Sequence, residues 1–423
     1  MLCTVYYIIS SGNIYNRHKL ETDFDYFVIR MNVKNITDCY GCGMCATVCA
    51  KKIIEITLNK NGFYEPRITD LDKCTNCGLC MDVCAYSHKE LALVKDETTI
   101  KSWAAWSDDE VVRHRCSSGG IGYEIARQLI AKKYKLCGCR YNAEKNCAEH
   151  YIAMTPDEAI HSIGSKYIQS YTVDGFKAIN RKDKYIVTGT PCQIDSFRRY
   201  IKKFRVEDNF VLLDFYCHCA PSMLAWKKYS KMVEKQTGRI DKASWRNKSA
   251  VWDDSLSSSL GIEPPKGEKV NWHDSYNILI KGETDCYNSR RSQGDVFYNL
   301  FLGDFCCNPA CAKKCKYKYN QSSADIRIGD LWGNTYKDNK KGVSALIAFT
   351  PKGLEIVEQL HDVTLIEHPF EIVAEGQMQK NVKQKEMTFA VRWFLRTKLS
   401  ITNPILKTIF LIQKVINKIK EFI

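Results

Sequence analysis

The chain has 423 residues, 45% of them hydrophobic and 26% charged, a balance typical of a folded globular protein and unlike that of a disordered one. It carries 21 cysteines and a formal net charge of +14, but the basic residues are spread along the chain, which argues against nucleic acid as a partner. Neither a secretory signal nor an apolar run long enough to cross a bilayer is present, so we expect a cytoplasmic protein whose cysteines are reduced and bind metal more often than they form disulfides.

The N-terminal part contains a cysteine repeat. Residues 1–30 carry no motif and are predicted to be an extension, with Met31 as an alternative start to Met1. Residues 31–98 are predicted to form one domain with two pseudo-symmetric halves, because four cysteines recur at an offset of 35 residues. The first copy is Cys39, Cys42, Cys45 and Cys49, and the second is Cys74, Cys77, Cys80 and Cys84.

Each copy has the spacing C-x2-C-x2-C-x3-C, which is typical of bacterial two-cluster ferredoxins. Three cysteines at this spacing bind one [4Fe-4S] cluster, and the fourth binds the other cluster. One cluster is therefore assigned to Cys39, Cys42, Cys45 and Cys84, and the other to Cys74, Cys77, Cys80 and Cys49. A pair of zinc sites is the alternative, but zinc prefers two C-x2-4-C pairs separated by a longer gap. Alanine replaces the usual proline after the fourth cysteine of both copies, at Ala50 and Ala85, which removes no ligand.

Residues 99–380 show a mixed α/β pattern. We expect a helix at 121–132 after "SSGG", strands at 134–140 and 151–154, and a helix start at "TPDEA". A strand at 185–188, the turn "GTPCQI" and a helix at 193–204 follow, and "NFVLLDFY", "CHCAPS" and "MLAWKKYSKMVEKQ" repeat this order. Residues 254–295 are predicted to be irregular, "DIRIGDLWG" and "VSALIAFT" to be strands, and "TPKGLEIVEQL" to be a turn and a helix. The fold class is therefore α+β, with a ferredoxin-type domain followed by a mixed α/β domain.

Residues 381–423 are predicted to form a basic helical segment. Over 404–423 a stripe of isoleucines recurs at helical spacing, namely Ile405, Ile409, Ile412, Ile416, Ile419 and Ile423. We expect this helix to pack on its own domain or on a partner. Contact with a membrane surface is the alternative, which we rank second because interfacial helices usually carry more bulky aromatics.

Seven stretches occur in one order behind the ferredoxin repeat: "SSGG", "IGSKYIQS", "GTPCQI", "CHCAPSMLAWKKY", "WRNK", "CAKKCKY…SADIRIGDLWG" and "GVSALIAFTPKG". Together, residues 31–350 resemble the coenzyme F-420 hydrogenase/dehydrogenase beta subunit family. The resemblance implies an oxidoreductase with FAD and a further [4Fe-4S] cluster. Such an enzyme passes electrons between a protein partner and a deazaflavin or another small-molecule redox substrate. The alternative is a non-catalytic electron-transfer subunit of a larger reductase, for which a bacterial surface-polysaccharide pathway, the setting of some relatives, is one candidate.

The resemblance also implies the ligands of a third cluster, namely Cys192, Cys217, Cys311 and Cys315. The first two stand where a strand ends and a helix begins, a place where sites gather in α/β sheets and where a helix N-terminus favours a thiolate. The second pair has the spacing C-x3-C where the family has C-x2-C, and residue 219 is cysteine where the family has glycine. Cys219, Cys306 and Cys307 are therefore alternative ligands. Buried inert thiols, or Cys192 as a nucleophile activated by His218, are the competing interpretations.

The flavin contacts are likewise implied by the resemblance. The turn Ser117, Ser118, Gly119 and Gly120 precedes a helix and presents backbone N–H groups to a pyrophosphate. Lys166 is expected near flavin N1, where a fixed ammonium raises the reduction potential. The other expected contacts are Gly164, Ser165, Tyr167, Gln169, Thr190 and Gln193. No catalytic acid or base is assigned.

Overall fold

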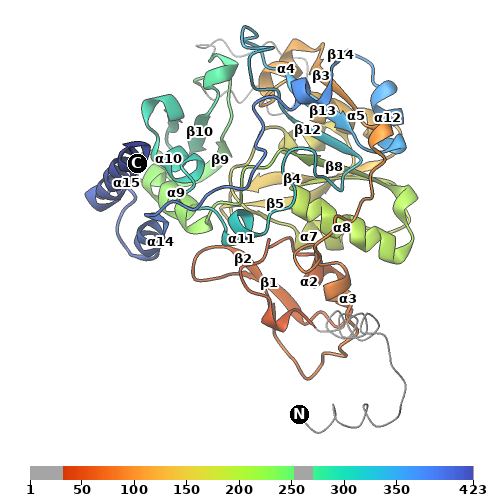
Figure 1. Cartoon of the computed structure of the whole chain (residues 1–423), viewed down its shortest axis with the longest axis horizontal. Helices are drawn as coiled ribbons and strands as arrows, with labels where there is room; N and C mark the ends of the chain where they lie inside the picture. The colour runs from red at the N-terminus through yellow and green to blue at the C-terminus, as the bar shows by residue number, and fades with distance from the viewer. Residues whose placement is uncertain (1–31, 252–269, 423) are drawn as a thin grey trace.

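The computed structural model describes residues 32–251 and 270–422. The predicted extension 1–30, the alternative start Met31, part of the predicted irregular segment and Ile423 lie outside these residues. Within them, a small cysteine-rich part lies against one side of a large sheet, and a helical layer with a smaller sheet lies beside that sheet (Figure 1). None of the described helices combines the length and apolar character that crossing a bilayer requires.

The cysteine-rich part has the predicted two-fold repetition. It contains the antiparallel hairpin β1 (Ile54–Leu58) and β2 (Tyr64–Ile68), and the short helices α2 (Met44–Val48) and α3 (Leu79–Asp82). Each helix follows a glycine in the left-handed conformation, Gly43 with φ 78° and Gly78 with φ 78°, a turn that side chains rarely permit. The equivalent glycines explain why "CGMC" and "CGLC" match in the two copies.

The large sheet has nine strands in the order β14-β3-β13-β12-β8-β7-β4-β5-β6. Its four central strands, β12, β8, β7 and β4, run parallel, whereas β13, β3 and β14 on one side and β5 on the other pair antiparallel. Parallel strands end at one edge of a sheet, and sites form there. The strand bounds are β3 (Lys101–Ser107), β4 (Lys135–Asn142), β5 (Cys147–Ala153), β6 (Ser170–Tyr171), β7 (Tyr185–Gly189), β8 (Phe210–Phe215), β12 (Ile326–Asp330), β13 (Ser344–Ala348) and β14 (Val363–Glu367).

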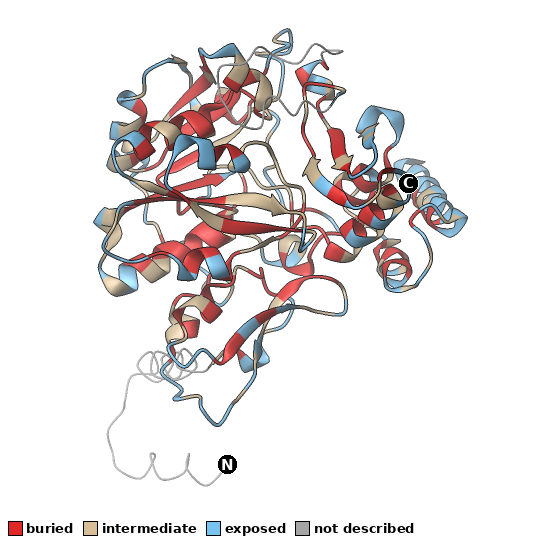
Figure 2. Ribbon diagram, turned by 180° about the vertical axis from the view of Figure 1, so that it is seen from behind, coloured by how far each residue is buried: buried red, intermediate tan, exposed pale blue. Residues whose placement is uncertain are grey.

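Helices cover the sheet, and its strands β7 and β8 are mostly buried, whereas β4 and β12 are buried only in part; red and tan mark the two classes in Figure 2. Several helices begin at a side-chain cap: Ser222 accepts a hydrogen bond from Leu224 N at 3.2 Å, and Thr350 accepts one from Gly353 N at 3.1 Å. The helix bounds are α4 (Glu110–Arg115), α5 (Ile121–Ala131), α6 (Pro156–Ala159), α7 (Val173–Lys177), α8 (Pro191–Phe204), α9 (Met223–Thr237), α10 (Val296–Leu302), α11 (Pro309–Lys313), α12 (Pro351–Glu358), α13 (Phe370–Val373), α14 (Thr388–Arg396) and α15 (Pro404–Phe422).

The two predicted strand–turn–helix units are confirmed as β7–α8 and β8–α9. The prediction of irregular structure over 254–295 is wrong for its described second half, which forms the hairpin β10 (Asn277–Gly282) and β11 (Cys286–Arg290). This hairpin pairs with β9 (Ile240–Ser244) in a separate three-stranded sheet. Strand β11 is a polar edge strand, "CYNSR", so its sequence lacks the apolar alternation that predicts a strand.

Candidate functional site

The first predicted group of ferredoxin cysteines comes together in the structure. Burial raises the pKa of the Cys45 thiol far above its ordinary value, and the charges of Cys42, Cys84 and Cys39 raise it further. The last cysteine of the second copy thus lies with the first three of the first copy, as the spacing predicts. Buried thiols placed this close repel one another as thiolates, and a bound metal cluster offsets that repulsion.

The second predicted group has the complementary composition. Burial raises the pKa of Cys80 to about 11, and the charges of Cys77, Cys49 and Cys74 act in the same direction. Cys77 is exposed, so this group lies nearer the surface than the first. A group at the surface is the one that an external protein can approach most closely.

The four cysteines expected to hold the third cluster also meet, although they come from three separate segments. Cys192 lies in the first turn of α8, Cys217 follows β8, and Cys311 and Cys315 lie in and just after α11. Burial raises the pKa of Cys192 most, followed by the charges of Cys217 and Cys311. Burial also raises the pKa of Cys217 to about 11, and the charge of Cys315 adds to this. The unusual C-x3-C spacing therefore still brings both of its cysteines into the group.

The third group lies next to the first ferredoxin group. The charge of Cys42 is among those that raise the pKa of Cys192. Between them, the buried Ser196 hydroxyl is 3.2 Å from Cys42 Sγ and accepts a hydrogen bond from Ala85 N at 3.1 Å. Tyr40, next to Cys39, also joins the two groups, because its hydroxyl donates a hydrogen bond to the carbonyl of Lys314, the residue before Cys315. The start of α8 thus connects the cysteine-rich part to the large sheet.

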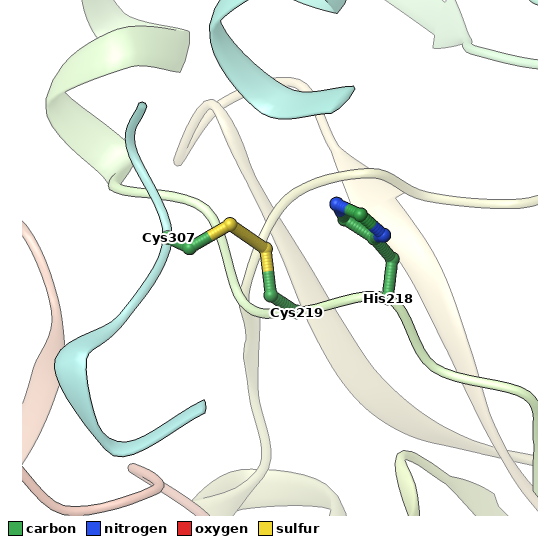
Figure 3. Close-up of side chains that lie close together, drawn as sticks. All are labelled: His218, Cys219 and Cys307. Carbon is green, nitrogen blue, oxygen red and sulfur yellow. A yellow bond between two sulfur atoms is a disulfide. The ribbon is translucent and has the colours of Figure 1, made fainter. Parts of the chain in front are cut away.

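A disulfide joins Cys219 and Cys307 in the structure (Figure 3). The alternative that either residue replaces a cluster ligand is therefore wrong here, as is the expectation of a free thiol at these two positions. The two chain segments are held side by side, because Ser222 N donates to Cys306 O at 2.8 Å and Asn308 N to Ala220 O at 2.8 Å. Cys306 itself is buried outside the third group.

His218 has partners other than Cys192. Its Nε2 lies 2.8 Å from Asp304 Oδ1, and its Nδ1 lies 3.1 Å from Met378 Sδ. Both ring nitrogens are engaged, and neither contact supports His218 as a base for Cys192. The nucleophile interpretation of Cys192 therefore receives no support from this geometry.

A cavity of about 950 Å³ lies at the carboxyl ends of the parallel strands. Cys192, Cys217 and Cys311 line it, which places the third cysteine group in its wall. The expected flavin contacts that also line it are Ser117, Ser118, Gly120, Gly164, Ser165, Lys166, Tyr167, Gln169, Thr190 and Gln193. Gly119 is not among the lining residues, because its amide faces the sheet and donates to Ser344 Oγ at 3.0 Å.

The "SSGG" turn is held in place from two sides. Ser117 Oγ accepts a hydrogen bond from Ser165 N at 2.8 Å, which joins the turn to the "GSKYIQS" segment. Lys248, from the "WRNK" stretch, donates to the carbonyls of Ser118 at 2.6 Å, Arg113 at 2.7 Å and Lys341 at 2.6 Å. Burial lowers the pKa of Lys248 to about 7. Its role is to fix the backbone of the turn.

Lys166 lines the cavity, but its ammonium bonds to its own turn. It donates to the carbonyls of His161 at 3.1 Å, Ile163 at 2.9 Å and Gly164 at 3.2 Å, and burial lowers its pKa to about 8. The expected contact of Lys166 with flavin N1 stays a prediction. Because these carbonyls already use its donors, such a contact requires Lys166 to exchange one of them for the cofactor.

The two expected glutamine contacts also hold the protein together. Gln169 donates to the carbonyls of Gly62 at 2.9 Å and Pro221 at 2.8 Å, and so ties the β1–β2 hairpin to the cavity wall. Gln193 accepts a hydrogen bond from Thr190 N at 2.9 Å as part of the capping box that begins α8. Both amides are therefore fixed at the cavity edge by the backbone around them.

An aromatic wall forms another side of the cavity, and of its rings Tyr167 was predicted from the sequence but Tyr276 was not. Tyr276 stacks with Trp332 at a ring distance of 6.0 Å and an interplanar angle of 16°, and with Tyr167 at 6.0 Å and 23°. Arg246 lies 4.5 Å from the Tyr276 ring and pairs with Asp330 at 2.6 Å. The rings of Tyr167, Tyr276 and Trp332 line the cavity and provide a flat surface on which a planar heterocycle can stack.

Two residues of the cavity wall, Tyr216 and His150, each have a buried polar atom without a hydrogen-bond partner among the described residues. The Tyr216 hydroxyl is buried and has no hydrogen-bond partner within the described part of the chain. A buried donor without a partner costs free energy unless a ligand satisfies it. The cavity, its aromatic wall and this hydroxyl therefore fit a large planar cofactor with polar edges.

Comparisons with known proteins extend these observations. Residues 182–369 match the family described as the C terminus of the coenzyme F420 hydrogenase/dehydrogenase beta subunit, and residues 38–87 match the 4Fe-4S dicluster domain. Coenzyme F420 hydrogenase subunit beta from Methanococcus voltae is 28% identical over 296 residues, which are 67% of this chain and 91% of that protein. A chain of the F420-reducing [NiFe] hydrogenase complex from Methanosarcina barkeri is 17% identical with a TM-score of 0.40, covering 72% of this chain and 91% of its own length.

Proposed function

Because this chain is an oxidoreductase homologous to the coenzyme F420 hydrogenase beta subunit, with an N-terminal 4Fe-4S dicluster domain, we propose that it is an iron–sulfur flavoprotein. In this proposal it holds two ferredoxin clusters, a third [4Fe-4S] cluster and FAD. It exchanges electrons with a protein partner and hydride equivalents with a deazaflavin-like or other small-molecule substrate. When bound, the clusters supply one-electron transfer, and the flavin couples single electrons to two-electron chemistry.

The observation that carries the proposal is the meeting of four partly buried cysteines beside the cavity, three of which line its wall. Cys192, Cys217 and the pair Cys311 and Cys315 come from three separate segments, yet their charges act on one another. They are free thiols in the structure, since the nearby disulfide uses two other cysteines. Four such thiols between the first ferredoxin group and the cavity are the ligands that a bridging cluster requires.

The chain's own residues prepare this place for a thiolate. Cys192 lies at the N-terminus of α8, a helix of 14 residues, where the helix dipole stabilises negative charge. Thr190 Oγ1 lies 3.2 Å from Cys192 Sγ and can donate a hydrogen bond to it. The Lys318 ammonium donates to the carbonyl of Cys217 at 2.6 Å and lowers the pKa of that thiol against the effect of burial.

The cavity supports the flavin part of the proposal by size and composition. Its volume of about 950 Å³ lies within the range of roughly 300–1,000 Å³ that small-molecule sites occupy. In the proposal, Tyr276 and Trp332 stack against the ring system or its substrate, and the Tyr216 hydroxyl donates to a polar edge. The first turn of α5, which begins at Ile121, receives the pyrophosphate.

The test is a cofactor count on protein purified without oxygen. The proposal expects about twelve irons per chain together with bound FAD, whereas a count of about eight irons would show that the third cluster is not present. A Cys192→Ser variant should lose about four irons, and Cys147→Ser, a buried thiol outside all three groups, should lose none. Protein that contains all its iron but no flavin would refute the flavoprotein part alone.

A non-catalytic electron-transfer subunit is the second candidate. It is favoured by the match to a protein named as a hydrogenase subunit. Turnover separates the two: the isolated chain, once its flavin is reduced, is offered a deazaflavin, a nicotinamide and other two-electron acceptors. Reduction of any of them supports the enzyme, and failure with all of them, in protein that holds both cofactors, supports the subunit.

A further inference from the structure

The C-terminal helices α14 and α15 expose an unusual amount of apolar surface. They lie together at the edge of the molecule, and pale blue marks much of α15 (Figures 1 and 2). Among the described residues, thirteen large hydrophobic side chains are exposed, and seven of them lie in these two helices. The seven form what we call the outer face: Phe389, Trp393, Ile405, Leu411, Ile412, Val415 and Ile419. Such clustering marks an interaction surface rather than scattered surface residues.

Helix α15 has two apolar sides, where the sequence predicted one. Leu406 and Ile409 are buried against the core, so the part of the predicted stripe at Ile409 faces inward. Ile412 and Ile419, two turns apart, are 43% and 53% exposed, so this part of the stripe faces solvent. Packing on the domain therefore accounts for only one of the two sides.

The helix is fixed in this orientation by polar contacts. Gln413, buried on the inner side, accepts a hydrogen bond from Met387 N at 3.0 Å and donates to Glu386 at 2.5 Å. Lys420 pairs with the same Glu386. These contacts join α15 to the start of α14, so the outer face cannot turn inward without breaking them.

Basic residues border the outer face. Lys407, Lys414 and Lys418 are exposed and recur at spacings of seven and four, which places them in one row beside Leu411 and Val415. Residues 388–422 contain seven lysines and arginines and a single acidic residue, Glu421. Anionic lipid headgroups attract such a row, whereas protein interfaces are depleted of lysine.

We propose that the outer face of α14 and α15 binds the surface of a membrane that contains anionic lipid. The apolar side chains enter the boundary between headgroups and acyl chains, and the lysine row contacts the headgroups. The aromatic side chains typical of an interfacial segment are supplied by the neighbouring helix, through Phe389 and Trp393, one turn apart on α14. This location at a membrane does not depend on the cofactors or on the substrate.

The test is flotation of the purified full chain with vesicles of phosphatidylcholine alone or mixed with phosphatidylglycerol. The protein should float with the mixed vesicles, less at high salt, and hardly at all with phosphatidylcholine. Val415→Asp and Trp393→Ser should each reduce the bound fraction severalfold, and Lys414→Gln should weaken binding about fivefold. Met154→Ser, which changes an exposed apolar residue outside these helices (59% exposed), should have no effect.

Three results would overturn the proposal. The first is an absence of flotation with the mixed vesicles by protein with an intact circular dichroism spectrum. The second is flotation that Val415→Asp and Trp393→Ser leave unchanged, since the outer face then takes no part. The third is a stable dimer by light scattering that Val415→Asp dissociates and that does not bind vesicles, because a second copy of the chain then covers this face.

Discussion

The buried ion pair between Arg327 and Asp214 offers a demanding test of how the third cysteine group is supported. Both side chains are fully buried, and the contact is bidentate, with Arg327 Nε 2.7 Å from Asp214 Oδ1 and Nη2 2.8 Å from Oδ2. Asp214 precedes Cys217 by three residues. Arg327 also donates to the carbonyls of Tyr319 at 2.8 Å and Gln321 at 2.9 Å, in the segment after Cys315. One guanidinium thus orders the chain next to two of the cysteines.

Replacing Arg327 with methionine keeps much of the side-chain volume but leaves the Asp214 carboxylate buried, with Ser322, at 2.7 Å, as its remaining hydrogen-bond partner among the described residues. Breaking a buried ion pair in this way should lower the free energy of unfolding by about 3–5 kcal/mol. In the double variant Arg327→Met/Asp214→Asn, no unpaired charge is left, so about 2 kcal/mol of the loss should be recovered.

Urea unfolding of the wild type, both single variants and the double variant measures this coupling. The exposed pair Lys341–Glu110, at 2.8 Å, provides the control, and Lys341→Met should change stability by less than about 1 kcal/mol. If the decreases in the free energy of unfolding of the two single variants simply add in the double variant, Arg327 and Asp214 are not coupled, and other contacts must order the cysteine segments.

Two further predictions follow from other buried groups. Burial lowers the pKa of His150 to about 4 from its ordinary 6.5, so between these pH values the unfolded chain binds a proton that the folded chain excludes. On going from pH 7 to pH 4, this residue should therefore lower the free energy of unfolding by about 3 kcal/mol. Urea titrations of His150→Gln should lack this part of the decrease. The Cys219–Cys307 disulfide closes a sequence separation of 88 residues, so Cys307→Ser should lower stability by about 4–5 kcal/mol, and dithiothreitol should then have no further effect on its thermal unfolding, in contrast to the wild type.

The sequence was most informative where the chemistry depends on local spacing. The ferredoxin groups follow from the distances between cysteines along the chain, and the β7–α8 and β8–α9 units follow from apolar runs that end at a turn. Each of these patterns is complete within a short stretch, so no knowledge of tertiary contacts is needed. The crossed grouping of the ferredoxin cysteines was predictable for the same reason, because a short turn cannot bring the fourth cysteine to its own cluster.

The cavity wall was less predictable because its parts meet only in the tertiary structure. Tyr276 lies just before strand β10, in a segment without a strand pattern, and nothing local indicates that it stacks between Trp332 and Tyr167. The partner of Cys219 was hidden for a similar reason, since Cys307 reaches it through pairing of two irregular segments. Gln169 lines the cavity, and its contact with a cofactor stays a prediction; its amide also bonds to backbone groups that sequence alone cannot place beside it.

The start of α8 explains how a site of such scattered parts keeps a fixed geometry. Cys192 and Ser196 are four residues apart, one helical turn, and therefore lie on one face of the same rigid helix. Cys192 belongs to the cavity wall, whereas Ser196 contacts Cys42 and the backbone of Ala85 in the cysteine-rich part. A single helical turn thus sets the spacing between the first ferredoxin group and the cavity group, whatever the connecting loops do. We therefore expect Ser196→Ala, which removes one hydroxyl, to change the relative positions of the first ferredoxin group and the cavity group. A substitution on the exposed face of the same helix should change them less.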